Sequence, residues 1–317
     1  MRLARVVTVA LAVLLGAAFT VSPASAQPNR PHYPVSYRLA DAVAAELQHP
    51  GAAPIGANDW TCTPGPRHPN PVVLVHGGPE TPQLDWQALA PLLANNDYCV
   101  FALNYGTLAG LPAPLHAVGG LTPIEQSAHE LGTFVDRVLT ATGAREADIV
   151  DHSEGNLVAG YYVKFLGGAD KVSRLVSLGP GWAGTNSLGI AAGVTRLAAE
   201  LGLTPTLNAL VDPICAACLQ IQHGSQFLGT LTDGGAAVPG VAYTNIMTRH
   251  DEVVLPYTSG YLQAPNAVNL LVQDYCPGDL SDHILLTYDP VAAQLVLDAL
   301  DPDDAVRPSC TTTPANS

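Results

Sequence analysis

A serine at the junction of a short β-strand and a helix constrains the fold more than any other part of the sequence. Residues 147–155 read ADIVDHSEG, and the β-prone pair Ile149 and Val150 precedes the serine, Ser153. A helix-prone segment, residues 156–162, follows without a linker. A strand that turns sharply into a helix exposes a serine hydroxyl at the tip of the turn. The sequence therefore predicts a nucleophilic serine at the end of a strand.

This segment matches four of the five positions of G-x-S-x-G, the nucleophile elbow of α/β-hydrolases. Asp151 replaces the first glycine, and Gly155 is the second. A serine hydroxyl is a weak nucleophile that needs a nearby base and backbone N–H groups for the developing oxyanion. The elbow provides this setting, so the segment indicates acyl transfer on Ser153.

Apolar strands alternate with helical segments along most of the chain. Strands are expected over 71–75, 99–103, 147–150, 172–178, 241–247 and 267–272, and helices over 37–47, 86–94, 122–142, 156–166 and 283–300. Uninterrupted apolar strands are typical of a parallel sheet covered on both faces. We predict the α/β class and an α/β-hydrolase fold, with a mostly parallel central sheet, helices on both faces and a helical cap insert.

The alternation fails between Gly181 and Pro239, where a helix-like stretch over 189–202 precedes Gly- and Thr-rich sequence. An insert at the carboxyl end of such a sheet would lie over the active site. We expect residues 27–317 to form a single domain with a cap insert at about 181–239.

Residues 122–125 predict how the long central helix begins. Thr122 can accept a hydrogen bond from the amide of Glu125, Pro123 suits the first helical position, and the Glu125 side chain can bond back. We expect Gly143 to end this helix.

The first 26 residues have the parts of a secretory signal peptide. Arg2 and Arg5 give a positive start, residues 6–15 form an apolar core, and residues 24–26 read ASA, a typical cleavage site. A membrane anchor is the alternative, but the short core and the small residues favour cleavage. We expect a secreted protein with no stable membrane anchor.

Charge limits the possible partners. Loss of the signal peptide removes two of the 13 basic residues and none of the 27 acidic ones, so the net charge changes from −14 to −16. An acidic chain is not attracted to nucleic acid or anionic lipid. We expect a neutral substrate, no nucleic-acid partner and a monomer.

All six cysteines follow the expected cleavage site, and an even number in a secreted chain indicates three disulfides. Spacing alone does not choose among the possible pairings. A zinc site at Cys215 and Cys218 lacks a second pair of ligands, and a redox role lacks a thioredoxin-like context.

The base and the acid are predicted from chain order, which in α/β-hydrolases is serine, acid, histidine. The histidines after Ser153 are His223, in the expected cap, His250 and His283. His283 lies in a loop after the last expected strand, and we predict it as the base.

The acid should follow the preceding strand, and Asp251 stands just beyond residues 241–247. Glu252 and Asp282 are the nearest alternatives. We interpret His250 as a neighbour of the acid.

Two backbone amides are predicted to receive the oxyanion. Glycines after the first strong strand let the backbone approach the substrate carbonyl, which makes Gly78 the first donor. Glu154, the residue after the nucleophile, supplies the second through its backbone. We interpret His76 as a structural histidine.

Six segments together resemble the actinobacterial secreted lipases of the α/β-hydrolase superfamily, the class 2 triacylglycerol lipase family, which includes esterases and polyester-active members. They are NDWTC (58–62), PVVLVHG (71–77), NNDYCVFALNYG (95–106), HSEGN with YYVKFLGG (152–156 and 161–168), HDEVVLPYTSGYL (250–262) and CPGDLSDH (276–283). The resemblance covers about Tyr37 to Cys310. It implies hydrolysis of carboxylic esters with apolar acyl chains, such as acylglycerols, without a metal or an organic cofactor.

The resemblance implies Ser153 as nucleophile, Asp251 as acid and His283 as base. It also implies three disulfides, which are Cys62–Cys99, Cys215–Cys218 and Cys276–Cys310.

Two residues depart from the family pattern, because Asp151 and Asn156 stand where the family has glycine. A carboxylate at position 151 would add bulk and charge near the triad, disfavour the oxyanion and favour the imidazolium form of His283. Activity should then need a higher pH. The alternative function is a catalytically silent member that binds lipid or a cell-envelope component.

Overall fold

The computed structural model describes residues 31–186, 202 and 204–310. The expected signal peptide and residues 189–201 of the expected cap helix lie outside these residues. The strands are β1 (Val72–Val75), β2 (Val100–Leu103), β3 (Ala147–His152), β4 (Val172–Leu178), β5 (Ala242–Met247) and β6 (Ala267–Leu271). The helices are α1 (Leu39–Gln48), α2 (Pro82–Trp86), α3 (Leu89–Asn95), α4 (Ile124–Thr142), α5 (Gly155–Phe165), α7 (Thr204–Gln220), α8 (Gln226–Thr232), α9 (Val272–Tyr275) and α10 (Pro290–Leu300).

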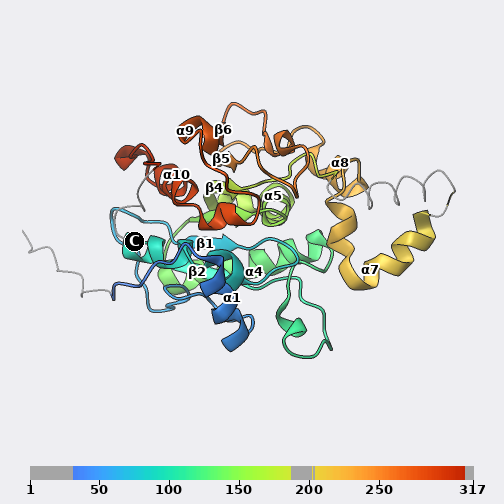
Figure 1. Cartoon of the computed structure of the whole chain (residues 1–317), viewed down its shortest axis with the longest axis horizontal. Coiled ribbons are helices and arrows are strands. Elements are labelled where there is room, and N and C mark those ends of the chain that lie inside the picture. The colour runs from blue at the N-terminus through green and yellow to red at the C-terminus, as the bar shows by residue number, and fades with distance from the viewer. Residues whose placement is uncertain (1–30, 187–201, 203, 311–317) are drawn as a thin grey trace, which may run out of the picture. The chain divides into compact units, whose positions relative to one another are not determined.

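The described strands form one sheet in the order β2-β1-β3-β4-β5-β6, and every neighbouring pair is parallel (Figure 1). This confirms the predicted α/β class and its parallel sheet. The strand order reverses between β1 and β3. In such sheets the crevice at the carboxyl ends beside the reversal is the usual place for a site, and β3 ends at the candidate nucleophile.

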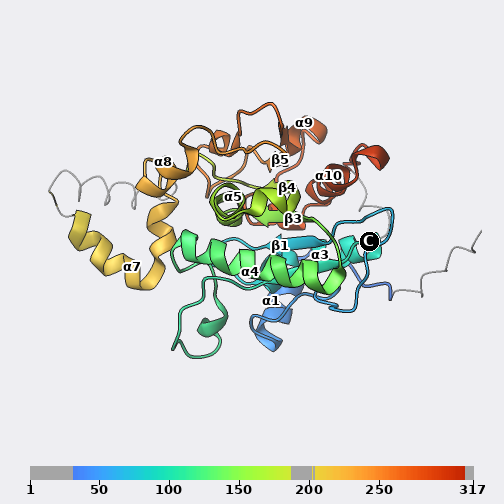
Figure 2. The same ribbon diagram turned by 180° about the vertical axis from the view of Figure 1, so that it is seen from behind.

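Helices cover both faces of the sheet. Successive side chains of a strand point to opposite faces, so Val73 and Val75 of β1 join the core under α4 and α5, whereas Val72 and Leu74 join the core under α3 and α10. Figure 2 shows α4 and α5 in front of the strands. Gly143 ends α4 in the left-handed conformation, as expected.

Helix α4 begins differently from the prediction, because no local capping box forms. Pro123 precedes the helix without a side-chain cap, and Thr122 does not bond to the helix amides. Gln220 of α7 takes this role. Its Oε1 accepts a hydrogen bond from the amide of Ile124 at 2.7 Å, and its Nε2 donates to Glu125 at 2.6 Å. A side chain 96 residues away in the sequence therefore caps the helix.

The segment between β4 and β5 contains α7 and α8. Helix α8 buries Phe227, Leu228 and Leu231 against the core under α5. Helix α7 meets the start of α4, and the amide of Ala216 donates to the carbonyl of Leu121 at 2.9 Å. The two helices lie beside α4 and α5 in both views (Figures 1 and 2).

Three disulfides join the pairs that the resemblance implies, which are Cys62–Cys99, Cys215–Cys218 and Cys276–Cys310. The first ties the segment before β1 to the start of β2. The last ties the C-terminal segment to the end of α9. Among the described residues, no helix has the length and apolar character needed to cross a membrane.

Gly155 sets the distance between the elbow helix and β1. A Cβ atom at this position would lie 2.4 Å from the carbonyl oxygen of Val75 and 2.8 Å from that of His76. Both obstacles are backbone atoms, so a side-chain rotation cannot relieve the contact. Any larger residue must push α5 away from the sheet.

We therefore predict that Gly155→Ala lowers the free energy of unfolding by about 3 kcal/mol, the upper end of the usual overpacking cost. Gly229→Ala is the matched control, because Gly229 lies in α8 with no atom within 4 Å of the added methyl group. It should be neutral, or stabilising by about 0.5–1 kcal/mol. Urea denaturation of both variants measures the difference, and equal stability would contradict the steric argument.

Candidate active site

Ser153 occupies a strained turn between β3 and α5. Its φ angle is 50°, in the left-handed region that residues with side chains seldom adopt. The backbone fixes this conformation, because the amide of Ser153 donates to the carbonyl of Leu178 at 2.9 Å and its carbonyl accepts from Asn156 at 3.1 Å. The turn is the expected elbow.

The structure brings together the three residues that chain order and the resemblance select. His283 Nε2 lies 2.8 Å from Ser153 Oγ, and His283 Nδ1 lies 2.8 Å from Asp251 Oδ2. Asp251 and His283 are buried, with 6% and 3% of their surfaces exposed. This is the hydrogen-bond chain that a serine nucleophile, a base and an orienting acid require.

The surrounding backbone fixes the acid and the base. The other oxygen of Asp251, Oδ1, accepts from the amides of Val253 at 3.0 Å and Val254 at 2.6 Å. A Cβ atom at Gly179 would lie 3.0 Å from the imidazole of His283, so the glycine leaves room for the ring. These contacts hold the Asp251 carboxyl group in one orientation and leave one position for the His283 ring.

The two residues predicted as oxyanion donors contact each other. Gly78 follows β1, and Glu154 follows Ser153. Among the described residues, neither amide donates to another group. The side chain of Glu154 covers Gly78, because a Cβ atom there would lie 2.3 Å from Glu154 Oε2. Burial raises the pKa of Glu154 to about 8, so this carboxyl group is mostly uncharged at neutral pH.

The alternative residues lie outside the hydrogen-bond chain. His250 and His223 are exposed. Glu252 accepts a hydrogen bond from the amide of His283 at 3.2 Å, not from its ring, and Asp282 accepts from a neighbouring loop amide. His76 is buried and pairs with an asparagine of a loop, as a structural histidine would.

Asp151 has a hydrogen-bond partner that the sequence did not indicate. Its side chain is buried on the sheet face under α5, where its Oδ2 accepts a hydrogen bond from Ser177 of β4 at 3.0 Å. Burial raises the pKa of Asp151 well above its ordinary value, although Ser177 and His152 oppose the shift. The raised pKa disfavours the charged form of Asp151, and the side chain bonds to the neighbouring strand.

A buried charged cluster behind the nucleophile was not predicted. It contains Glu80, Asp85 and His152, whose ligand-type atoms lie within 4.8 Å of one another. His152 Nδ1 lies 2.8 Å from Asp85 Oδ1 and 3.5 Å from Glu80 Oε2. Such a set can bind a divalent cation or form an internal ion pair. No local sequence pattern indicates this cluster. Glu80 precedes α2, and Asp85 lies within α2, a helix of only five residues.

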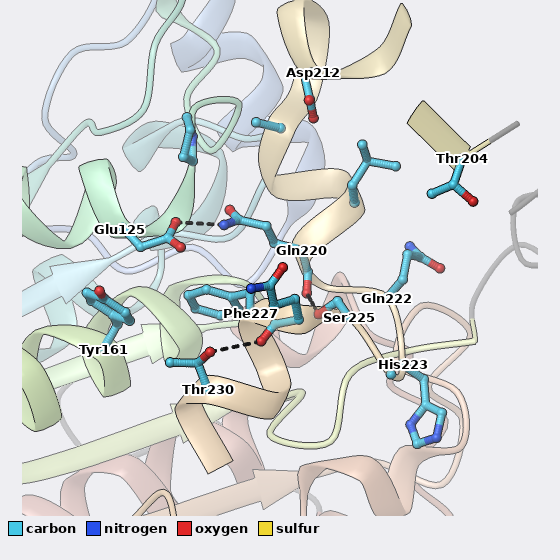
Figure 3. Close-up of a pocket in the computed structure, with 15 residues that line it drawn as sticks. Glu125, Tyr161, Thr204, Asp212, Gln220, Gln222, His223, Ser225, Phe227 and Thr230 are labelled. Carbon is cyan, nitrogen blue, oxygen red and sulfur yellow. Dashed lines mark hydrogen bonds between the residues drawn. The ribbon is translucent and has the colours of Figure 1, made fainter. Parts of the chain in front are cut away.

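The nucleophile opens onto a small apolar hollow of about 20 Å³. Leu157, Ile221, Val253 and Val254 provide its apolar lining. A larger cavity of about 860 Å³ lies between α4, α5, α7 and α8 and has a more polar lining (Figure 3). None of the triad residues lines it.

A parallel sheet with a serine elbow between β3 and α5, facing a histidine and an aspartate from later loops, defines an α/β-hydrolase. The chain belongs to the lipase (class 2) family, whose model matches residues 69–295.

Solved structures share this fold. Aspergillus fumigatus lipase B is similar at 18% identity and a TM-score of 0.60, over 82% of this chain and 57% of that one. Bacillus licheniformis lipase BlEst2 in mature form is 14% identical, with a TM-score of 0.52 over 79% and 96% of the two chains. A structure of the metagenome-derived lipolytic enzymes LipS and LipT is 14% identical, with a TM-score of 0.54 over 80% and 98%. At these identities the likeness concerns the fold alone.

The raised pKa of the buried Asp151 leads to a prediction about stability and pH. The folded protein holds this proton more tightly than the unfolded chain, whose pKa is near 3.8. The group thus adds stability that is complete below about pH 4 and is lost as the pH rises toward its raised pKa. Relative to Asp151→Asn, the wild type should lose up to about 1.4 kcal/mol of unfolding free energy per pH unit above pH 4.

Urea denaturation of both proteins between pH 4 and 8 measures this difference. Parallel stability curves would mean that Asp151 is ionised in the folded state. The acidic limb of the kcat/KM profile should not move, since Asp151 bonds to Ser177 and not to the triad.

Proposed function

We propose that the protein is a secreted serine hydrolase that cleaves carboxylic esters with apolar acyl chains. The observation that carries the proposal is the 2.8 Å contact of His283 with Ser153, completed by the 2.8 Å contact of the same ring with Asp251. Membership of the lipase (class 2) family supports the ester as substrate.

The geometry supports an acyl-enzyme mechanism. Ser153 attacks the ester carbonyl while His283 Nε2 takes its proton, and Asp251 holds the ring and stabilises the imidazolium. The amides of Gly78 and Glu154 receive the oxyanion. His283 then returns the proton to the leaving alcohol. Water, activated by the same histidine, releases the acid.

The apolar lining of the hollow beside Ser153 supports the proposal that the substrate has an apolar acyl group. Its lining combines Leu157 of α5 with Val253 and Val254 of the acid loop. Ile221 lines it from the segment between β4 and β5. This contact supports the proposal that residues 181–239 form a cap over the site. No organic cofactor or metal is needed for the chemistry.

Secretion is part of the same proposal. Three disulfides are typical of proteins that fold in an oxidising compartment. The signal-peptide pattern of residues 1–26 agrees with this. The silent lipid-binding alternative rested on Asp151, whose side chain is buried and bonds to Ser177 of the neighbouring strand.

We predict that Ser153→Ala abolishes hydrolysis of a short-chain chromogenic ester and that a phosphonate inhibitor labels Ser153 alone. Removal of a triad nucleophile or base lowers turnover on the order of 10⁶-fold. His283→Ala should have a comparable effect. Initial rates and mass spectrometry of the labelled protein measure these outcomes.

His250→Ala is the matched control, because His250 is an exposed histidine next to the acid. It should keep the wild-type rate. Substantial turnover by folded Ser153→Ala, or equal losses in the two histidine variants, would refute the triad. A wild type without ester hydrolysis would refute the proposed function.

A further inference from the structure

His152, the residue before the nucleophile, connects two loops of the site. The imidazole is 1% exposed, and its ring centroid lies 4.8 Å from that of His283. His152 Nε2 lies 3.2 Å from the backbone carbonyl oxygen of His283. On its other side, Nδ1 lies 2.8 Å from Asp85 Oδ1. The ring therefore contacts the backbone of the base loop and a carboxyl group of α2.

Asp85 continues the connection toward the oxyanion loop. Its second oxygen, Oδ2, accepts a hydrogen bond from the amide of Gly77 at 2.7 Å. Gly77 precedes the proposed donor Gly78 and lies close to the nucleophile, since a Cβ atom there would be 3.1 Å from Ser153 Cβ. One buried chain thus runs from the oxyanion loop through Asp85 and His152 to the base loop.

The contacts of His152 define its charge. The carbonyl oxygen of His283 lies at Nε2, and carboxyl oxygens of Asp85 and Glu80 lie at Nδ1, a setting that favours the imidazolium. Burial opposes this charge, but Asp85 and Glu80 outweigh it and raise the pKa of His152 well above its ordinary value. Contacts with His152 lower the pKa of Glu80 to about 2 against the effect of burial, whereas burial and Glu80 raise the pKa of Asp85 to about 7, so Glu80 is the counter-charge.

We infer that His152 is a positioning residue, which as an imidazolium links Asp85 and the oxyanion loop to the backbone of His283. This inference rests on the triad proposed above. His152 touches no reacting atom. It fixes the register between the loop that receives the oxyanion and the loop that carries the base. Small displacements of catalytic groups lower turnover on the order of 100-fold.

His152→Gln is the first test. Glutamine has a single amide nitrogen, so it cannot reach Asp85 and the carbonyl of His283 together. We expect kcat to fall on the order of 10- to 100-fold with KM within a factor of about 3, because the hollow for the acyl group is untouched. The variant also leaves the carboxylate of Glu80 without its counter-charge.

That uncompensated charge gives a second readout. The titratable groups that act on His152 or His283 are Glu80, Asp85, His76, Asp151, Asp251 and Glu252. Removing the cation among them favours the protonated base. The acidic limb of the kcat/KM profile should therefore move to higher pH in His152→Gln.

A double variant separates the effect of charge on activity from the effect of position. It also lowers the risk that the variant fails to fold. Glu80→Gln with His152→Gln removes both charges, so the cluster gains no buried, unpaired carboxylate. We expect its acidic limb to return toward that of the wild type while kcat stays low. Asp85→Asn should lower kcat to a similar extent. Combined with His152→Gln, it should add little, since both changes break the same link.

His68→Gln is the matched control. His68 is a buried histidine stacked on Tyr98, a residue at the amino end of β2, opposite the active-site edge of the sheet. It should keep wild-type kcat and the wild-type pH profile. Thermal unfolding of every variant establishes that kinetics are measured on folded protein.

Several outcomes would overturn the inference. A folded His152→Gln variant or double variant with wild-type kcat would do so. A change in KM with no change in kcat would do so too. A divalent metal bound at one equivalent, with activity lost on chelation, would make the cluster a metal site instead. These results differ from failure of the proposed function, in which the wild type itself lacks Ser153-dependent hydrolysis.

Discussion

The site depends on the strained turn at Ser153 and on the backbone contacts that hold this turn. Ser153 keeps a φ angle of 50°, a conformation that costs about 1–3 kcal/mol in a residue with a side chain. The cost is met by contacts on both sides of the turn. The carbonyl of Leu178 on β4 holds the serine amide, and Gly155 lets α5 approach the carbonyls that end β1. The hydroxyl points at His283 only because three strands fix the turn.

The two residues that replace the family's glycines, Asp151 and Asn156, form hydrogen bonds beneath this turn. Asp151 pairs with Ser177 on the neighbouring strand, and the same row of the sheet continues to Asn245, which accepts from Trp182 Nε1 at 2.7 Å. Asn156 uses its side-chain oxygen to accept from the amide of Gly181 at 2.8 Å. One polar atom of each side chain is thus hydrogen-bonded, whereas Asp151 Oδ1 and Asn156 Nδ2 have no hydrogen-bond partner among the described residues. Bulk at these positions is therefore absorbed under α5, away from the reacting atoms.

The sequence was informative wherever the signal was local or followed the chain order of the fold. Apolar runs located the strands, and the elbow with its downstream loops located Ser153, Asp251 and His283. The failures involve partners that are distant in sequence. Gln220 caps α4 from 96 residues away, and Asp85 meets His152 only after β1 and β3 pair. Hydrophobic periodicity in the sequence does not indicate such contacts. The partner of Asp151, Ser177 on β4, is likewise distant in sequence, and a motif does not reveal the burial that raises the pKa of Asp151.

Protonation explains how a site rich in carboxyl groups can still receive an oxyanion. Glu154 lies against Gly78, and a full negative charge there would oppose the charge that develops on the substrate. Burial keeps Glu154 mostly protonated near neutral pH and raises the pKa of Asp151 well above its ordinary value. Glu80 stays ionised only because His152 balances it. In a site of low dielectric, where each unpaired charge acts strongly, the acids next to the oxyanion are thus neutral or paired. Asp251 Oδ2 lies 2.8 Å from the imidazole of His283, which in the proposed mechanism becomes positive in the transition state.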